Sequence, residues 1–195
     1  MQVPLFPLNT VLFPGGPLPL RIFETRYVDM IGNCIKHDAP FGVLLIREGG
    51  EVGRATTYDI GTLARIVDWY QGSDGLLGVT ARGEHRFRLI SSRCELDGLS
   101  IGEIEVLPGE EDIPLPEKYR PMAKILAGVL DDLGRLYEDL ERRLDDAGWV
   151  TNRFVEILPI DLEEKQQCLE QSDPGERLRL VHDALRKVRG PIGTA

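Results

Sequence analysis

The first twenty residues decide how the chain starts to fold, because they are apolar but interrupted by prolines. Two stretches carry this pattern, Val3-Pro4-Leu5-Phe6-Pro7-Leu8 and Val11-Leu12-Phe13-Pro14-Gly15-Gly16-Pro17-Leu18-Pro19-Leu20. Proline lacks a backbone donor and pushes the residue before it towards extended geometry, so neither stretch can form a helix. The pattern predicts short edge strands joined by a Pro-Gly turn, with the leucines and phenylalanines facing a core.

The rest of the first half predicts one helix set among strands. Apolar residues between Phe23 and Ile35 recur at the spacing of one helical face, and Pro40 prevents that helix from continuing. The apolar run 41–46 predicts a well-buried strand. Several strands with one interrupting helix indicate a curled sheet or an open barrel. Two further hairpins are predicted, 60–70 with 76–81, and 87–94 with 99–107 around Asp97-Gly98.

A charged, proline-containing linker at residues 108–116 separates these strands from a helical half. Beyond it, apolar residues from Met122 to Leu144 keep a helical spacing, which predicts one long helix ended by Gly148. Three shorter helices follow: residues 149–158, a helix capped by Asp161 with Glu164 in the capping-box position, and a helix capped by Asp173 with Pro174 at its first position.

Several blocks of the sequence, in this order, resemble the Lon protease N-terminal domain. They are the proline-rich opening with Arg21-Ile22-Phe23-Glu24-Thr25-Arg26-Tyr27, residues 60–67, 74–79 and 83–88, and Leu162-Glu163-Glu164-Lys165-Gln166-Gln167-Cys168-Leu169-Glu170. The resemblance implies an α+β fold in which an open, PUA-like β-barrel with one helix precedes a C-terminal helical bundle. We expect a β-rich lobe at 1–107 and a helical lobe at 117–190, together forming one substrate-binding module.

The resemblance also implies a function. The Lon domain is the substrate-recognition module of an ATP-dependent protease, it also occurs as a stand-alone protein, and a related module lies within cereblon. We therefore expect a non-catalytic module that binds unfolded polypeptide segments or a partner protein without ATP, acting as a proteolysis adaptor. Two alternatives stay open: a PUA-like RNA-binding module and a small hydrolase with an unrecognised site.

Composition argues against several classes of partner and compartment. The formal net charge of -9 disfavours nucleic acid and anionic membranes, because phosphate repels an acidic protein. No signal-peptide pattern is visible, and no apolar run approaches the ~20 residues of a membrane span. We expect a cytoplasmic protein. The cysteines form no disulfide or zinc pattern and are interpreted as buried reduced thiols: Cys34, Cys94 and Cys168.

Catalytic and cofactor motifs are missing from the sequence. No Gly-Lys-Ser or Gly-Lys-Thr forms a phosphate-binding loop, and no serine lies in a Gly-x-Ser-x-Gly elbow. His37, His85 and His182 stand alone, without the paired spacing of a helical metal site. We therefore predict no catalytic residue, no metal, no cofactor and no enzymatic activity.

Aromatic side chains are the first candidates for a polypeptide-binding surface, because unfolded segments offer apolar groups. Tyr27, Trp69 and Tyr70 are candidates in the strand-rich half, and Trp149 is a candidate expected at the boundary between the two lobes. Trp69 and Tyr70 are neighbours on a predicted strand and point to opposite faces, so one of them should face outward.

Arginines are the second set of candidates. Arg86 and Arg88 alternate with Phe87 and Leu89 on a predicted strand, so both should project from one face. Such a face could hold acidic peptides or RNA. We favour a solvated outer face paired with carboxylates, because the surrounding charge is negative.

Overall fold

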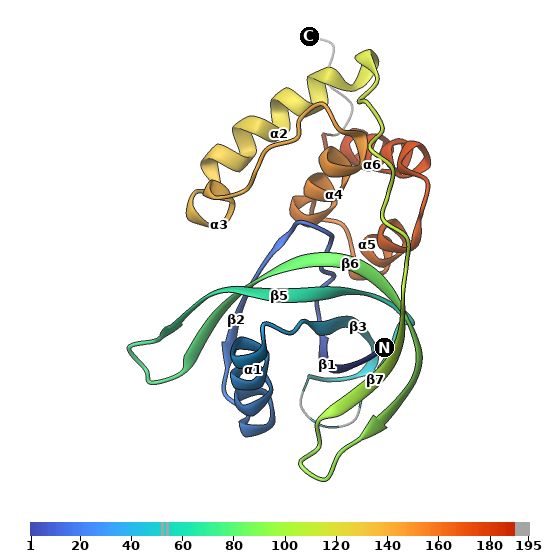
Figure 1. Ribbon diagram of the computed structural model, residues 1–195. Helices are drawn as coiled ribbons and strands as arrows, with labels where there is room; N and C mark the ends of the chain where they lie inside the picture. Colours follow the sequence, from blue (N-terminus) through green and yellow to red (C-terminus); the bar gives the residue numbers. More distant parts are fainter. Residues whose placement is uncertain (52, 54, 190–195) are drawn as a thin grey trace. The chain divides into compact units, whose positions relative to one another are not determined.

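Figure 1 shows a computed structural model of the chain, which describes residues 1–51, 53 and 55–189. The chain divides into two compact units, Met1–Gly109 and Glu110–Ala195. Strands β1 to β7 and helix α1 lie in the first unit, and helices α2 to α6 lie in the second. The fold is therefore of mixed α/β type with a β-sheet.

The first unit is built around a seven-stranded sheet whose strand order is β1-β7-β6-β5-β3-β4. Strand β1 also pairs with β3 in parallel, which closes five of the strands into a ring. The elements are β1 (Gln2–Leu8), β2 (Pro17–Ile22), α1 (Thr25–His37), β3 (Phe41–Gly49), β4 (Ala55–Thr57), β5 (Ile60–Gln71), β6 (Leu77–Cys94) and β7 (Ser100–Val106).

The two proline-rich strands have different places in this sheet. Strand β1 pairs with β3 on one side and with β7 on the other, so the prediction that it is an edge strand is wrong. Strand β2 pairs with β6 outside the main path of the sheet, as the prolines predicted for an edge. The proline-rich N-terminal segment thus supplies one strand of the closed ring, β1, and one edge strand next to it, β2.

Strand β6 runs without a break for 18 residues, where the sequence predicted two strands. The loop between β1 and β2 is fixed to the middle of β6, because Gly83 donates to the Gly16 carbonyl at 2.9 Å and accepts from Gly15 at 2.8 Å. A side chain at Gly83 would collide with the backbone of Phe13. Register shifts between β6 and its neighbours allow this long strand to curve around the core.

Two apolar clusters fill the first unit. The larger lies beneath α1, and the smaller lies on the other side of β1 and β3 and is centred on Phe87, which is fully buried. Gly42, Gly61 and Gly102 leave room for neighbouring Leu and Phe side chains in the smaller cluster. Buried members of the larger cluster include Phe6, Leu8, Leu18, Ile22, Tyr27, Met30, Ile31, Cys34 and Phe41.

The second unit corrects one predicted helix. The long helix expected from Met122 to Leu144 ends much earlier, because Gly134 adopts a φ of 63°, outside the helical region. Gly148 does not end a helix; it lies at the start of one. The helical elements are η1 (Glu117–Tyr119), α2 (Arg120–Asp132), α3 (Arg135–Glu138), α4 (Ala147–Ile157), α5 (Leu162–Glu170) and α6 (Pro174–Arg189).

The predicted helix starts in this unit are confirmed. Asp161 accepts from the Glu164 backbone at 2.7 Å, and Glu164 accepts in return from the Asp161 backbone, which forms the capping box of α5. Asp173 accepts from Gly175 at 2.8 Å, and Pro174 opens α6. Within the described residues, no helix is both long enough and apolar enough to cross a membrane.

A buried ion pair fixes the first residue of this unit to its last helix. The Arg177 guanidinium binds both carboxylate oxygens of Glu110, and the Arg177 side chain is completely buried. Gly148 leaves the space for this contact, since an added Cβ would lie 3.1 Å from the Glu110 carboxylate. A buried guanidinium that lost its carboxylate would remain charged without compensation.

Removing that carboxylate should destabilise the unit strongly. We expect Glu110→Gln to lower the free energy of unfolding by about 3–5 kcal/mol. The control is Glu117→Gln, which removes an exposed ion pair to Arg120. It should change the free energy of unfolding by less than about 1 kcal/mol. Urea denaturation of both variants makes the comparison, and equal losses would contradict the assigned role of Glu110.

A second buried pair joins Arg153 to Glu156 on α4. The Tyr137 hydroxyl donates to the Glu156 carboxylate at 3.4 Å, and Lys165 donates to the Glu156 carbonyl at 2.9 Å. Burial raises the pKa of the Glu156 carboxyl to about 7, against the opposing attraction of Arg153. The folded protein therefore holds this proton more tightly than the unfolded chain does.

The stability of the protein should depend on pH through Glu156. The proton that the folded protein holds on Glu156 stabilises it fully below the ordinary pKa of 4.5, and this stabilisation is lost as the pH rises through about 7. A shift of this size corresponds to about 3 kcal/mol. Glu156→Gln should flatten this slope between pH 5 and pH 8 in urea titrations, whereas the exposed control Glu163→Gln should keep it. A slope that survives in Glu156→Gln would exclude the carboxyl as its source.

Candidate binding grooves

An apolar groove of about 380 Å³ opens in the first unit between β1, β2 and the start of α1. Strand β1, which lies inside the sheet, supplies one wall of the groove. Strand β2, which lies at an edge of the sheet, supplies the other. The apolar side chains that line the groove come from these three elements and from the segment between β2 and α1: Phe6, Leu8, Leu18, Pro19, Leu20, Ile22, Phe23 and Tyr27.

The floor of the groove is an aromatic stack. The rings of Phe6 and Tyr27 lie 4.1 Å apart at an interplanar angle of 22°, and Phe41 packs against Phe6 at 6.2 Å. The Arg26 guanidinium lies 4.6 Å from the centre of the Tyr27 ring. Burial raises the pKa of the Tyr27 hydroxyl, so it stays protonated. The floor is therefore an uncharged, preformed aromatic surface.

Phe23 lies at the mouth of the groove and is 62% exposed. The sequence placed it on the buried face of a helix, but α1 begins only at Thr25, so Phe23 precedes the helix. An exposed phenylalanine beside a buried aromatic floor offers apolar area that no other described part of the chain covers. The sequence alone gave no signal for this exposure, because Phe23 fits the helical spacing.

The charged groups around the groove are largely engaged. Arg21 forms an ion pair with Asp74, and Arg26 pairs with Glu24 at 2.8 Å. Glu51 accepts a hydrogen bond from the Asn9 backbone at 2.8 Å. Since these groups already have partners, the chemistry that the groove offers to a ligand is mainly apolar.

The other aromatic candidates lie outside this groove. Trp69 and Tyr70 are 58% and 55% exposed, so both face solvent, although the alternation required only one to do so. They lie near the end of the β5–β6 hairpin, where the core no longer covers either face. Tyr70 lies over Gly78, and a side chain at Gly78 would collide with the tyrosine ring. Trp149 is half-buried on α4, 5.9 Å from the Arg153 guanidinium.

The expected pair of outward-facing arginines is not present. Arg86 is only 6% exposed and lies in register with the fully buried Thr62, whereas Arg88 is exposed. Arg86 therefore does not share an exposed basic face with Arg88, which weakens the support that this pair gave to the RNA alternative.

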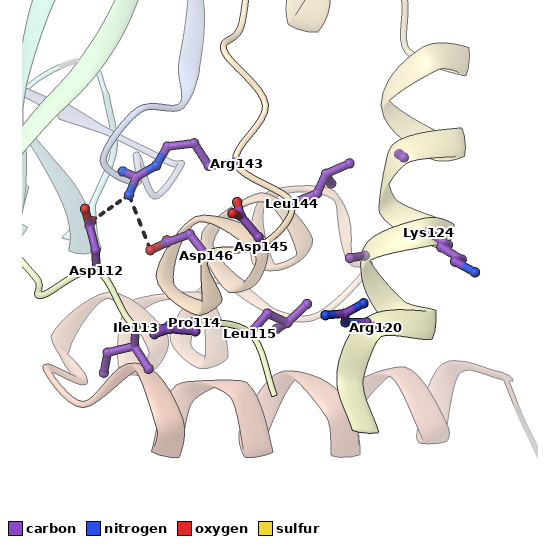
Figure 2. A pocket seen from close by; sticks show the side chains of 12 residues that line it. Asp112, Ile113, Pro114, Leu115, Arg120, Lys124, Arg143, Leu144, Asp145 and Asp146 are labelled. Carbon is purple, nitrogen blue, oxygen red and sulfur yellow. Dashed lines mark hydrogen bonds and ion pairs between the residues drawn. The ribbon is translucent and has the colours of Figure 1, made fainter. Parts of the chain in front are cut away.

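A second groove, of about 690 Å³, lies entirely within the helical unit (Figure 2). It runs between α2 and two paired segments, residues 112–115 and 143–146. Its apolar floor is made of Leu115, Ala123, Ala127 and Leu144, and charged side chains stand on both sides. The sequence did not single out this groove, because its walls are separated along the chain.

The described residues hold no assembly suited to metal chemistry: they contain no group of three His, Cys, Asp or Glu side chains placed to bind an ion. All three cysteines are free. Cys34 and Cys168 are buried as expected, and burial raises the pKa of both thiols, whereas Cys94 is exposed against expectation.

Comparison with known proteins agrees with this architecture. The model of the ATP-dependent protease La (LON) substrate-binding domain matches residues 2–187. The chain belongs to the Lon substrate-binding domain family. The crystal structure of a Lon N-terminal domain protein from Xanthomonas campestris superposes with a TM-score of 0.78, at 34% identity, over 94% of this chain and 98% of that one. The resemblance seen in the sequence is thereby confirmed.

Two of the curated relatives are longer proteins that match this chain over only part of their own length. Lon protease 2 of Myxococcus xanthus is 26% identical across 96% of this chain, and protein cereblon of Xenopus tropicalis is 30% identical across 59% of it. The chain spans about a quarter of the length of these curated relatives, 24% and 26%. The N-terminal domain of a Mycobacterium avium complex Lon protease shares the fold, with a TM-score of 0.66 at 19% identity.

The two aromatic residues of the first groove should respond differently to truncation. Tyr27→Ala removes a buried ring from the floor and should cost about 3–5 kcal/mol of unfolding free energy. Phe23→Ser removes an exposed ring and should change stability by no more than about 0.5 kcal/mol. Denaturant titration monitored by circular dichroism measures both, and a large loss in Phe23→Ser would show that Phe23 supports the fold.

Proposed function

We propose that this Lon-family domain captures exposed apolar segments of other polypeptides in the groove between β1, β2 and α1, reversibly and without ATP. The observation that carries the proposal is the exposed Phe23 at the mouth of a preformed aromatic floor. Family membership supports it, because the matching domain is described as substrate-binding.

The geometry suits one or two apolar side chains better than a folded surface. A groove of about 380 Å³ accepts a few side chains, and its stacked floor needs no rearrangement before binding. Affinity for any single segment should be modest, because an unfolded segment loses conformational entropy when it binds. Modest affinity fits a recognition module that must release what it binds.

The proposal predicts which side chain matters for binding. A fluorescein-labelled unstructured peptide with aromatic and leucine residues should bind saturably in an anisotropy titration, and binding should persist at high salt. Phe23→Ser should weaken binding by about tenfold or more, the loss typical of an aromatic side chain that becomes buried when the partner binds. Val67→Ser is the matched control, since Val67 is 50% exposed on β5, outside the groove.

Two outcomes would count against the proposal. Equal weakening by Phe23→Ser and Val67→Ser would place binding elsewhere. Retention of a labelled RNA at low salt, lost as salt is added and absent in Arg88→Glu, would favour the nucleic-acid alternative.

A further inference from the structure

We propose that the groove of the helical unit docks an amphipathic helix of a partner protein, one edge of which is acidic and the other basic. This surface is independent of the apolar groove beside β1 and β2, so either proposal can fail without the other. The charge pattern of the second groove carries the inference.

The two sides of the groove have opposite charge. Arg120 and Lys124 stand on α2, and in Figure 2 the Arg120 side chain extends towards Leu115 while Lys124 projects away. The facing side carries Asp112, Asp145 and Asp146 against the single cation Arg143, as Figure 2 also shows. The groove is therefore bordered by Arg120 on the α2 side, with Lys124 further out on the same helix, and by a net acidic side opposite, with an apolar floor between them.

The acidic side is held in place by backbone and side-chain contacts. Leu115 donates to the Asp145 carbonyl at 2.6 Å, and Ala147 donates to the Ile113 carbonyl at 2.8 Å. Arg143 bridges Asp112 at 2.6 Å and Asp146 at 3.4 Å. These contacts join the two segments into one wall, so its charges have fixed positions before any partner binds.

Charges on both sides remain available to a partner. Asp145 is exposed, and its side chain forms no ion pair or hydrogen bond within the described part of the chain. Arg120 pairs with Glu117, but their side chains are 66% and 80% exposed, so exchanging that partner costs little. A partner can therefore form an ion pair with Arg120 on one side of the groove and with Asp145 on the other.

The floor favours a helix as the occupant. Ala123 and Ala127 are one turn apart on α2, and small residues at such positions allow a second helix to approach closely. The groove presents the basic Arg120, an apolar floor and an acidic side next to one another. A helix can match all three at once with an apolar stripe and two flanking edges, whereas an extended segment has only two faces.

The test uses three synthetic helical peptides that share one leucine stripe. The first carries glutamates along one edge and lysines along the other, the second carries glutamates on both edges, and the third carries lysines on both edges. The mixed peptide should bind the intact chain about tenfold more tightly than either of the others, the sum of several exposed ion pairs. Added salt should reduce this advantage.

Variants of the chain separate the charge pattern from general adhesion. Arg120→Glu combined with Lys124→Glu makes both sides acidic, so preference should move to the all-lysine peptide. Ala127→Gln should obstruct the apolar floor of the groove and weaken the binding of all three peptides. Gly128→Gln is the matched control, because Gly128 is exposed on the same helix with nothing within 4 Å of an added Cβ.

The proposal is overturned if no peptide binds, if the mixed peptide has no advantage, or if Gly128→Gln acts like Ala127→Gln. Sedimentation of the chain alone tests a different occupant, since self-association abolished by Ala127→Gln would assign the groove to a second copy of this chain. Phe23→Ser should leave binding of the mixed peptide unchanged, which keeps this surface distinct from the capture of apolar segments.

Discussion

The parallel pairing of β1 with β3 is the contact on which the first unit depends. It joins the first strand of the sheet order to β3, closes the ring of five strands and gives β1 two hydrogen-bonded neighbours, β3 and β7. Because β1 is held on both sides, Phe6 has a fixed position against Tyr27, and the aromatic floor exists before any ligand arrives. Strand β2 lacks this constraint on its outer side, and the groove opens there.

Proline has a double role in this arrangement. It prevents the opening from forming a helix, which makes both strands possible, and it removes backbone donors from β2, which lies at an edge. An edge with fewer donors is a poor template for pairing with another chain, so ligands are more readily held by side chains than by backbone. The apolar groove beside β2 is consistent with side-chain recognition.

Sequence patterns predicted the elements better than they predicted exposure. The helix after Phe23, the buried strand from Phe41 and the capped helices after Asp161 and Asp173 all follow from local chemistry. The place of β1 was not predictable in this way, because it depends on pairing with β7, which lies about a hundred residues later. The burial of Arg86 depends on its place beside Thr62 of β5, and the exposure of Phe23 depends on where α1 begins.

The helical unit shows why periodicity alone is insufficient. Tyr137 and Leu140 are buried and fit the spacing of α2, yet Gly134 ends the helical path, and Tyr137 lies in the separate short helix α3. If the long helix had continued, residues 143–146 could not fold back to pair with 113–115 and form the acidic wall. Gly134, which ends the helix that the apolar spacing predicted, therefore also makes the second groove possible. A chain with one uninterrupted helix here would keep the apolar spacing and lose the opposed charges that select a partner.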